Sequence, residues 1–191
     1  MKHRISFHFI QVLAILLFVF ASGISGAQIP TDAETGEFVY EEVVQVEGIS
    51  KDSLFARAAD WFKRALFADD DSIVEKSPDN KFIRAIKNMD FANNVLSSLD
   101  TSIKNTLTFN LAVYFKEGRY KYKIDQMIYH YYLVAKANQT RIVSPLEKVK
   151  YLSKKRENLY REVDLRINRM INGLKSAMQG AISNDGAQDD W

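Results

Sequence analysis

Histidine and cysteine are scarce in this chain, and this limits the chemistry that it can perform. The 191 residues include three His and no Cys, and His3 and His8 lie in an N-terminal segment that we expect to be removed. His130 is then the one imidazole available as a general base or a metal ligand. It has no Cys or second His with which to share a metal, and no motif gives it an oriented partner. We therefore favour a structural role for His130 and predict no metal site, no cofactor and no catalytic residue.

The carboxylates show no spacing typical of a catalytic or calcium-binding site. Asp69, Asp70, Asp71 and Glu75 are close together, but they lack the alternating spacing and central Gly of a calcium loop. Glycoside hydrolysis needs two carboxylates that flank a cleft, and the spacing of the acids selects no such pair. The sequence contains no nucleophile elbow, phosphate-binding loop or dinucleotide-binding glycine pattern. A hydrolase whose site is built from scattered acids and tyrosines stays open as an alternative.

Tyrosines in the middle of the chain are candidates for a binding surface. A Tyr side chain offers a large contact area with a polar tip, and we single out Tyr114 and Tyr131, together with the neighbouring His130. The alternative is that these rings pack in the core, as aromatic residues of strands usually do. Tyr120 and Tyr122 are predicted to lie on the apolar face of their strand, whereas Tyr114 is predicted to lie on the opposite face.

A basic segment is the second candidate surface. Residues 28–77 hold 5 Lys/Arg and 12 Asp/Glu, whereas residues 141–175 hold 10 Lys/Arg and 4 Asp/Glu. The densest positive charges include Lys148, Lys150, Lys154 and Lys155. They could attract an anionic envelope polymer or lipid headgroups. The alternative is a solvated helix face that balances the acidic part of the chain.

The firmest structural prediction is a β-hairpin over residues 105–132. Glu117-Gly118 is typical of a two-residue turn in which Gly supplies a positive φ. If this turn sets the register, paired residue numbers sum to 235. The apolar face then pairs Phe115–Tyr120, Val113–Tyr122, Leu111–Ile124 and Leu107–Ile128, and the polar face pairs Tyr114–Lys121, Ala112–Lys123, Asn110–Asp125 and Thr108–Met127. Only Phe109 opposite Gln126 interrupts the apolar series.

Residues 1–27 have the features of an export signal. Lys2 and Arg4 precede an apolar run, Val12 to Phe20, which is too short to span a bilayer comfortably. Small residues then favour cleavage after Ala27. Removal of this segment would lower the formal net charge from +2 to zero and leave no transmembrane span. We expect an exported protein, periplasmic or secreted; a retained N-terminal anchor helix is the alternative.

The remaining segments predict a single α+β domain at residues 37–180, after a leader at 28–36 and before a disordered tail at 181–191. Turn signals and apolar periodicity predict strands at 37–46, 72–76 and 81–87, a helix from the N-cap Ser50 to about Phe67, and a helical region from Ser144-Pro145 to about Gln179. The first strand should be well covered. Residues 136–143 read as a loop, and residues 88–104 carry no clear pattern.

The long C-terminal helix should pack against the sheet through one apolar stripe. Its members are Leu152, Leu159, Val163, Ile167, Met170, Ile171, Leu174 and Met178. They recur at helical spacing, so they share one side of the helix. Gly180 is a natural C-terminal stop.

Several stretches together resemble a known family. Glu41 to Ser50, then Leu54, Arg57-Ala58 and Trp61-Phe62, and finally Lys116 to Tyr122, are similar in order and spacing to exported Bacteroidetes proteins of a domain-of-unknown-function family. The resemblance covers about residues 30–130. It implies a TATA-binding-protein-like (TBP-like) fold, β-α-β4-α: an antiparallel sheet with one helix after the first strand and a long C-terminal helix on the same face. The family often has Gly-containing strands where this chain has residues 82–86, which leaves the pairing of the second and third strands open.

The resemblance implies a fold and export, and it supplies no catalytic residues. A shared fold with the TATA-binding protein does not imply DNA binding, and export argues against a nucleic-acid partner. The sequence therefore favours an exported, non-catalytic binding or interaction module of the cell envelope. Its partner would be an unknown envelope protein or an anionic envelope ligand. An envelope hydrolase is the alternative.

Overall fold

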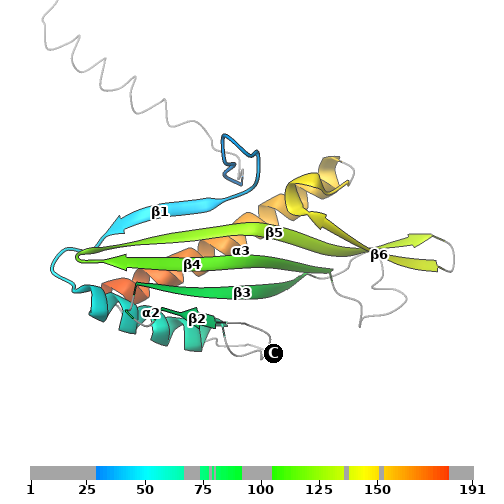
Figure 1. The fold of residues 1–191 in the computed structure, drawn as a ribbon. Helices are drawn as coiled ribbons and strands as arrows, with labels where there is room; N and C mark the ends of the chain where they lie inside the picture. Colours follow the sequence, from blue (N-terminus) through cyan, green and yellow to red (C-terminus); the bar gives the residue numbers. More distant parts are fainter. Residues whose placement is uncertain are drawn as a thin grey trace, which may run out of the picture.

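Antiparallel strands form the centre of the molecule, which is described here by a computed structural model (Figure 1). The structure describes residues 29–66, 74–77, 79, 81–91, 105–135, 138–150 and 153–180. Within these ranges the chain forms six strands, two α-helices and one 3₁₀ turn. They are β1 (Tyr40–Gln45), α2 (Lys51–Leu66), β2 (Val74–Lys76), β3 (Phe82–Phe91), β4 (Asn105–Lys116), β5 (Arg119–Ala135), β6 (Asn138–Pro145), η1 (Leu146–Lys148) and α3 (Ser153–Gln179).

The strands form one sheet with β5 and β4 at its centre. The order is β1-β5-β4-β3-β2, and β6 also pairs with β5. β1 pairs with residues 119–124 of β5, and β6 pairs with residues 128–135. Since β4 occupies the other edge of β5, β1 and β6 follow one another along the same edge.

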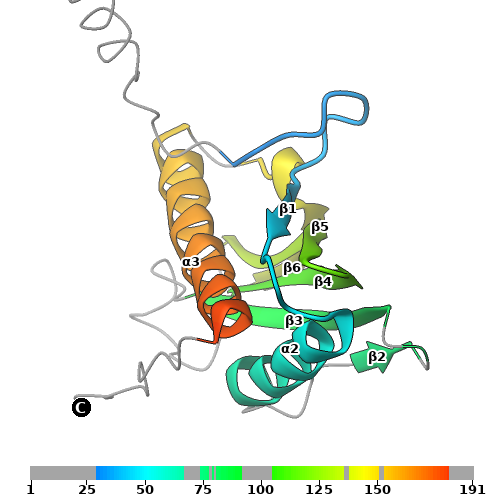
Figure 2. The same cartoon turned by 90° about the vertical axis from the view of Figure 1, so that its left-hand side faces the viewer.

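Both helices cover one face of this sheet, and no helix of the described ranges covers the opposite face, which we call the open face (Figures 1 and 2). Residues of α2 and α3 form one core with alternate residues of the strands, including Phe62, Val113 and Ile167, each 0% exposed. The helices are also joined directly, because the guanidinium of Arg57 in α2 donates to the carbonyl of Met178 at 2.5 Å. The predicted α+β layout, with both helices on one face, is confirmed.

Two predicted helix boundaries and the predicted apolar stripe of the long helix are confirmed. The Ser53 amide donates to Ser50 Oγ at 3.2 Å, so Ser50 is the N-cap of α2. Gly180 has φ +76° directly after α3, as expected of a C-terminal stop. The apolar stripe of α3 is buried at Leu159, Val163, Ile167, Ile171, Leu174 and Met178, with Met170 partly buried.

The central hairpin keeps the predicted register from its turn to Asn110–Asp125 and then departs from it. Beyond that pair, Thr108 lies opposite Ile128 and Leu107 opposite Tyr129, so the predicted pairs Thr108–Met127 and Leu107–Ile128 are wrong. A β-bulge causes the shift, because Gln126 is an extra residue with φ +51°. The side chains that face the core change from even to odd numbers, which buries Met127, Tyr129 and Tyr131.

The region after the hairpin also differs from the prediction. Residues 138–145 form β6 instead of a loop; a polar edge strand has weak apolar alternation, so the sequence did not reveal it. Ser144-Pro145 ends this strand, and only the short turn η1 follows, with no side-chain cap. α3 begins at Ser153, later than predicted.

Two further expectations about strands are corrected. β3 continues to Phe91, past the predicted end at Lys87, because its pairing with β4 extends to Asn105. β1 is an edge strand, and Val43 is 53% exposed, so it is not covered on both faces. The export signal, the end of α2 near Phe67, the acidic run at 69–71, Leu152 and the tail at 181–191 lie outside the described residues.

The segment before β1 is held against the domain. Ile29 is 2% exposed and belongs to the core, and a β-bridge joins Thr31 to Phe38. Between them, the Asp32 carboxylate accepts hydrogen bonds from the amides of Glu34 and Thr35. The hydrogen bond from the Thr35 amide, and then the one from its hydroxyl, lower the pKa of Asp32. This turn therefore fixes the conformation of the segment that precedes β1.

Candidate functional site

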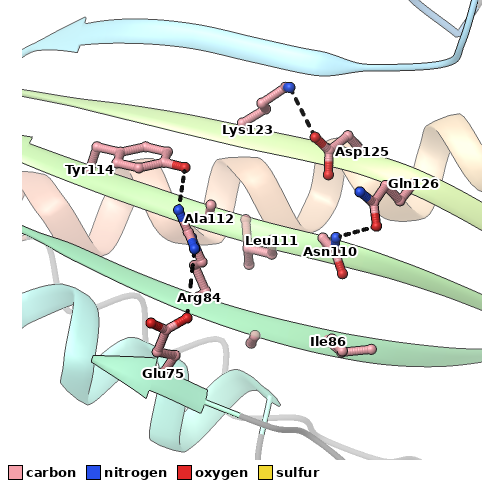
Figure 3. Close-up of a pocket in the computed structure, with 11 residues that line it drawn as sticks. Glu75, Arg84, Ile86, Asn110, Leu111, Ala112, Tyr114, Lys123, Asp125 and Gln126 are labelled. Atoms are coloured by element: carbon pink, nitrogen blue, oxygen red, sulfur yellow. Dashed lines mark hydrogen bonds and ion pairs between the residues drawn. The ribbon is translucent and has the colours of Figure 1, made fainter. Parts of the chain in front are cut away.

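The open face of the sheet is the candidate functional site. Alternation in the strands directs every second side chain of β3, β4 and β5 away from the helices. The residues of this face that surround one hollow are Arg84, Ile86, Asn110, Ala112, Tyr114, Lys123, Asp125 and Gln126, with Glu75 from β2 (Figure 3). They line a hollow of about 410 Å³, which is the size of small-molecule sites.

The hollow exists because a small residue occupies the centre of the face. Directly opposite residues form one row across five strands, in the order Glu75, Arg84, Ala112, Lys123, Glu41. Ala112 therefore lies between two long cationic side chains, and its methyl group leaves the space between them unfilled. Neighbouring positions in such a row are about 5 Å apart, so Arg84 and Lys123 rise from the two sides of an apolar floor.

The cations beside the hollow are paired with acids. Arg84 lies 3.7 Å from Glu75, contacts the Tyr114 hydroxyl at 3.4 Å, and places its guanidinium 4.6 Å from the centre of the Phe82 ring. The bond to Tyr114, followed by the charge of Glu75, raises the pKa of Arg84. Lys123 lies 2.9 Å from Asp125, and this contact raises the pKa of Lys123. Positive and negative charges are therefore balanced at this site.

The β-bulge adds a pair of amides to the rim of the hollow. Gln126 is the one non-Gly residue of the described chain with a positive φ. Its Oε1 accepts a hydrogen bond from Asn110 Nδ2 at 2.8 Å, and Figure 3 shows both amides on the open face. In an unbroken strand Gln126 would face the core, so the bulge turns a polar side chain outward. The pair leaves Asn110 Oδ1 and Gln126 Nε2 directed to solvent or a ligand.

His130 belongs to a second polar group on the same face, nearer to β6. Arg141 donates to His130 Nδ1 at 2.9 Å, His130 Nε2 lies 3.4 Å from Thr108 Oγ1, and this hydroxyl donates to Asn88 Oδ1 at 2.7 Å. An acceptor at Nδ1 requires the neutral ring with its proton on Nε2. Burial, and then the charge of Arg141, lowers the pKa of His130. These contacts connect four strands, consistent with a structural role.

The predicted tyrosine surface is divided between the two faces. Tyr114 lies on the open face as predicted, and Tyr120 and Tyr122 are buried as predicted at 1% and 5% exposure. Tyr131 is only 4% exposed and stacks on Tyr129, with 5.7 Å between ring centres. It cannot contribute to an exposed surface, because the bulge placed it on the core side.

Buried tyrosines connect the edge strand β1 to α3. The Tyr40 hydroxyl donates to Asp164 at 2.8 Å, and the Tyr122 hydroxyl donates to Glu42 at 2.8 Å. Lys175 also donates to Glu42, at 2.6 Å. The bonds from Lys175 and then Tyr122 lower the pKa of Glu42, while burial raises the pKa of Tyr40 and of Tyr122. These groups serve the packing of β1 and lie away from the open face.

The four candidate lysines lie apart from the hollow. Lys148, Lys150, Lys154 and Lys155 are all exposed, in η1, the following loop and the start of α3. They follow β6, which pairs with the far end of β5, whereas Tyr114 lies beside the hairpin turn. The structure therefore does not bring the basic segment and Tyr114 into one site. Partial burial of its ammonium group lowers the pKa of Lys155.

The open face carries paired charges, amides and a tyrosine hydroxyl. Across the described ranges, no group of three or more His, Asp and Glu side chains could hold a metal ion. Glu75 and Asp125 flank the hollow, but each contacts a cation. Sequence reasoning placed Ala112 and Lys123 on the polar face without recognising a site. The feature that indicates the hollow is a single Ala between residues with long side chains. It can be recognised only when the register of β3 against β4 is known.

Comparison with known proteins identifies the fold. The family described as "Domain of unknown function (DUF4468) with TBP-like fold" matches residues 40–130. A TBP-like protein from Parabacteroides distasonis has a TM-score of 0.63 and 16% identity, covering 80% of this chain and 98% of that one. A DUF4468 family protein from Bacteroides ovatus has a TM-score of 0.60 and 15% identity, covering 81% and 91%. No curated protein matches the chain.

The described helices include none that is long and apolar enough to cross a membrane. At 15–16% identity the two solved structures establish the fold alone. Taken with the family match, they confirm the resemblance seen in the sequence: residues 40–130 match the DUF4468 family, and the chain has a TBP-like fold.

Proposed function

We propose that this protein is a non-catalytic binding module of the cell envelope, and that the open face of its sheet is the recognition surface. The observation that carries the proposal is the hollow over Ala112, lined by polar side chains from β2, β3, β4 and β5 on a face that neither described helix covers. Its carboxylates contact cations and its one aromatic hydroxyl contacts Arg84. This arrangement favours binding over turnover, because a general acid or base works beside a nucleophile or an oriented partner, and the contacts of these groups form no such pair.

Export is part of the proposal and rests on the sequence. Lys2 and Arg4, the apolar run Val12 to Phe20 and the small residues before Gln28 are the features of a cleaved signal. Mass spectrometry of the protein secreted or released from the periplasm should give Gln28, or its cyclised form, at the N-terminus. A mature protein that retains the apolar run would contradict export by cleavage and indicate a membrane anchor.

Retention experiments test the recognition surface. The chain from Gln28 is immobilised and exposed to an envelope extract of Parabacteroides distasonis, which has a protein of this fold. Ile86 is 39% exposed on the open face, and Leu165 is 58% exposed on α3. A component retained by the parent and by Leu165→Arg, but lost with Ile86→Arg, is the expected result. Retention that is indifferent to Ile86→Arg would contradict the proposal.

The basic segment provides the competing surface for an anionic partner, and the same experiment separates the two. If Lys148, Lys150, Lys154 and Lys155 bound the partner, their combined replacement by Gln would abolish retention. Added salt would weaken it too, because exposed charges are screened within about 10 Å at 0.1 M. We expect retention through the open face to survive both changes. Turnover of an envelope substrate that is lost with a single acid or with His130 would instead establish the hydrolase.

A further inference from the structure

We propose that the hollow over Ala112 binds an uncharged saccharide. The inference rests on the proposed function and names the ligand class of the same surface. The site carries no net charge, because Arg84 is paired with Glu75, and Lys123 with Asp125. An anion beside either cation would be repelled by the carboxylate paired with it, whereas a neutral ligand meets no such repulsion.

The paired groups keep a mixture of unused donors and acceptors. A guanidinium has five N–H donors and a carboxylate about four acceptor positions, so the contacts of Arg84 with Glu75 and Tyr114 leave several of these positions unused. The amide pair adds a free acceptor, Asn110 Oδ1, and a free donor, Gln126 Nε2. A sugar hydroxyl both donates and accepts, and can therefore bridge neighbouring groups of this kind without carrying charge.

The hollow has an apolar floor. Ala112 is 9% exposed and Ile86 is 39% exposed, and both line the hollow beside the partly buried ring of Tyr114. One face of a pyranose ring presents C–H groups, which pack against such a floor while the hydroxyls at the ring edge reach the polar walls. The volume of about 410 Å³ is within the range of sites for small ligands.

Gln126 has a strained backbone, with φ +51°. A positive φ is unfavourable for a non-Gly residue, and such strain is found at functional sites. Its consequence here is that the Gln126 amide stands on the open face, in contact with Asn110. The core gains nothing from this amide, so its use is on the surface, at the rim of the hollow.

Nuclear magnetic resonance titration tests the inference on the chain from Gln28. The probes are the uncharged trisaccharides maltotriose, cellotriose and N,N′,N″-triacetylchitotriose, with phosphate and acetate as charged comparisons. We expect at least one trisaccharide to shift the methyl signals of Ala112 and Ile86, and the charged probes to leave them unchanged. No shift with any trisaccharide, or larger shifts with a charged probe, would overturn the inference.

Three variants locate the binding. Ala112→Leu fills the hollow, and Gln126→Gly removes the amide while keeping a residue that tolerates φ +51°; each should weaken saccharide binding at least about tenfold. Glu41→Gln changes a carboxylate of the same face outside the hollow, where it contacts Lys121 at 2.6 Å, and should leave affinity unchanged. Equal affinity in all three variants would overturn the location. If saccharides fail but retention still depends on Ile86, only the ligand class is wrong.

Discussion

Single residues at the centre of β4 show how sharply the two faces of the sheet differ. Val113 is 0% exposed and faces Tyr122 in the core, whereas its neighbour Ala112 forms the floor of the open hollow. The same substitution at the two positions therefore meets opposite surroundings. This contrast follows from the period of two in a strand, because adjacent side chains point to opposite faces.

Val113→Asp should unfold the domain or destabilise it severely, because it buries an unpaired carboxylate among apolar side chains. Ala112→Asp should be much milder, since its carboxylate reaches solvent beside Arg84 and Lys123. Urea denaturation followed by circular dichroism measures both. Equal damage from the two variants would mean that the open face is covered in solution.

His130 makes the stability depend on pH. Its pKa is lowered from 6.5 in the folded protein by burial and by Arg141, so the unfolded chain takes up a proton at a higher pH than the folded one. The free energy of unfolding therefore has its full value above about pH 6.5, where His130 is neutral in both states. It decreases as the pH falls through the lower pKa of the folded protein. His130→Gln cannot titrate. The urea midpoint of the parent, relative to that of the variant, should rise between about pH 5 and pH 7.5. A difference between the two midpoints that does not change with pH would contradict this account.

At the scale of elements, the β-bulge decides which side chains of β5 form the core. Core-facing residues are Tyr120, Tyr122 and Ile124 before it, and Met127 and Tyr129 after it. Deletion of Gln126 would restore continuous alternation and leave the same residues facing the core. We therefore expect the bulge to be dispensable for packing, whereas it determines which side chains lie on the open face.

The variant lacking Gln126 should fold with a urea midpoint equal to or above that of the parent. Deletion removes one positive-φ residue, which costs about 1–3 kcal/mol, and loses only an exposed amide pair. Chemical denaturation compared with Gln126→Gly measures the effect. A loss of more than about 2 kcal/mol would show that the packing of β5 requires the bulge.

The stripe of α3 is the principal helical contribution to the core. Ile167 is 0% exposed, and Leu165, two residues away, is 58% exposed. Ile167→Ala should cost about 2–5 kcal/mol of unfolding free energy, and Leu165→Ala should cost about 0.5 kcal/mol or less. Equilibrium urea denaturation measures both. Similar small costs would place the stripe on a surface and would contradict the packing of α3 against the sheet.

Periodicity explains which elements could be predicted from the sequence. The turn at Glu117-Gly118 and the stripe around Val163 combine local turn chemistry with regular apolar spacing, and both predictions hold. β6 was missed because an edge strand can be polar, and η1 interrupts the expected start of the long helix at Ser144. The only local sign of the bulge in the sequence is Gln126 within an apolar series. Whether such a residue forms a bulge depends on the register with the partner strand.

At the scale of the whole molecule, the site arises from topology. The hollow needs Glu75 and Arg84 beside β4 and Lys123 beside its other edge, and no local sequence pattern announces that alignment. The described helices cover one face of the sheet and supply its core, and they leave the other face uncovered (Figure 2). The paired charges then make the hollow polar without giving it net charge.

Methyl-resolved nuclear magnetic resonance, recorded while the chain from Gln28 is titrated with the envelope extract of Parabacteroides distasonis, tests most directly whether this open face is the binding surface. Ala112 and Ile86 report on the hollow, and Leu165 reports on the outer side of α3. The account predicts shifts of the Ala112 and Ile86 methyl signals with an unchanged Leu165 signal. Shifts at Leu165 with unchanged Ala112 and Ile86 signals would contradict it.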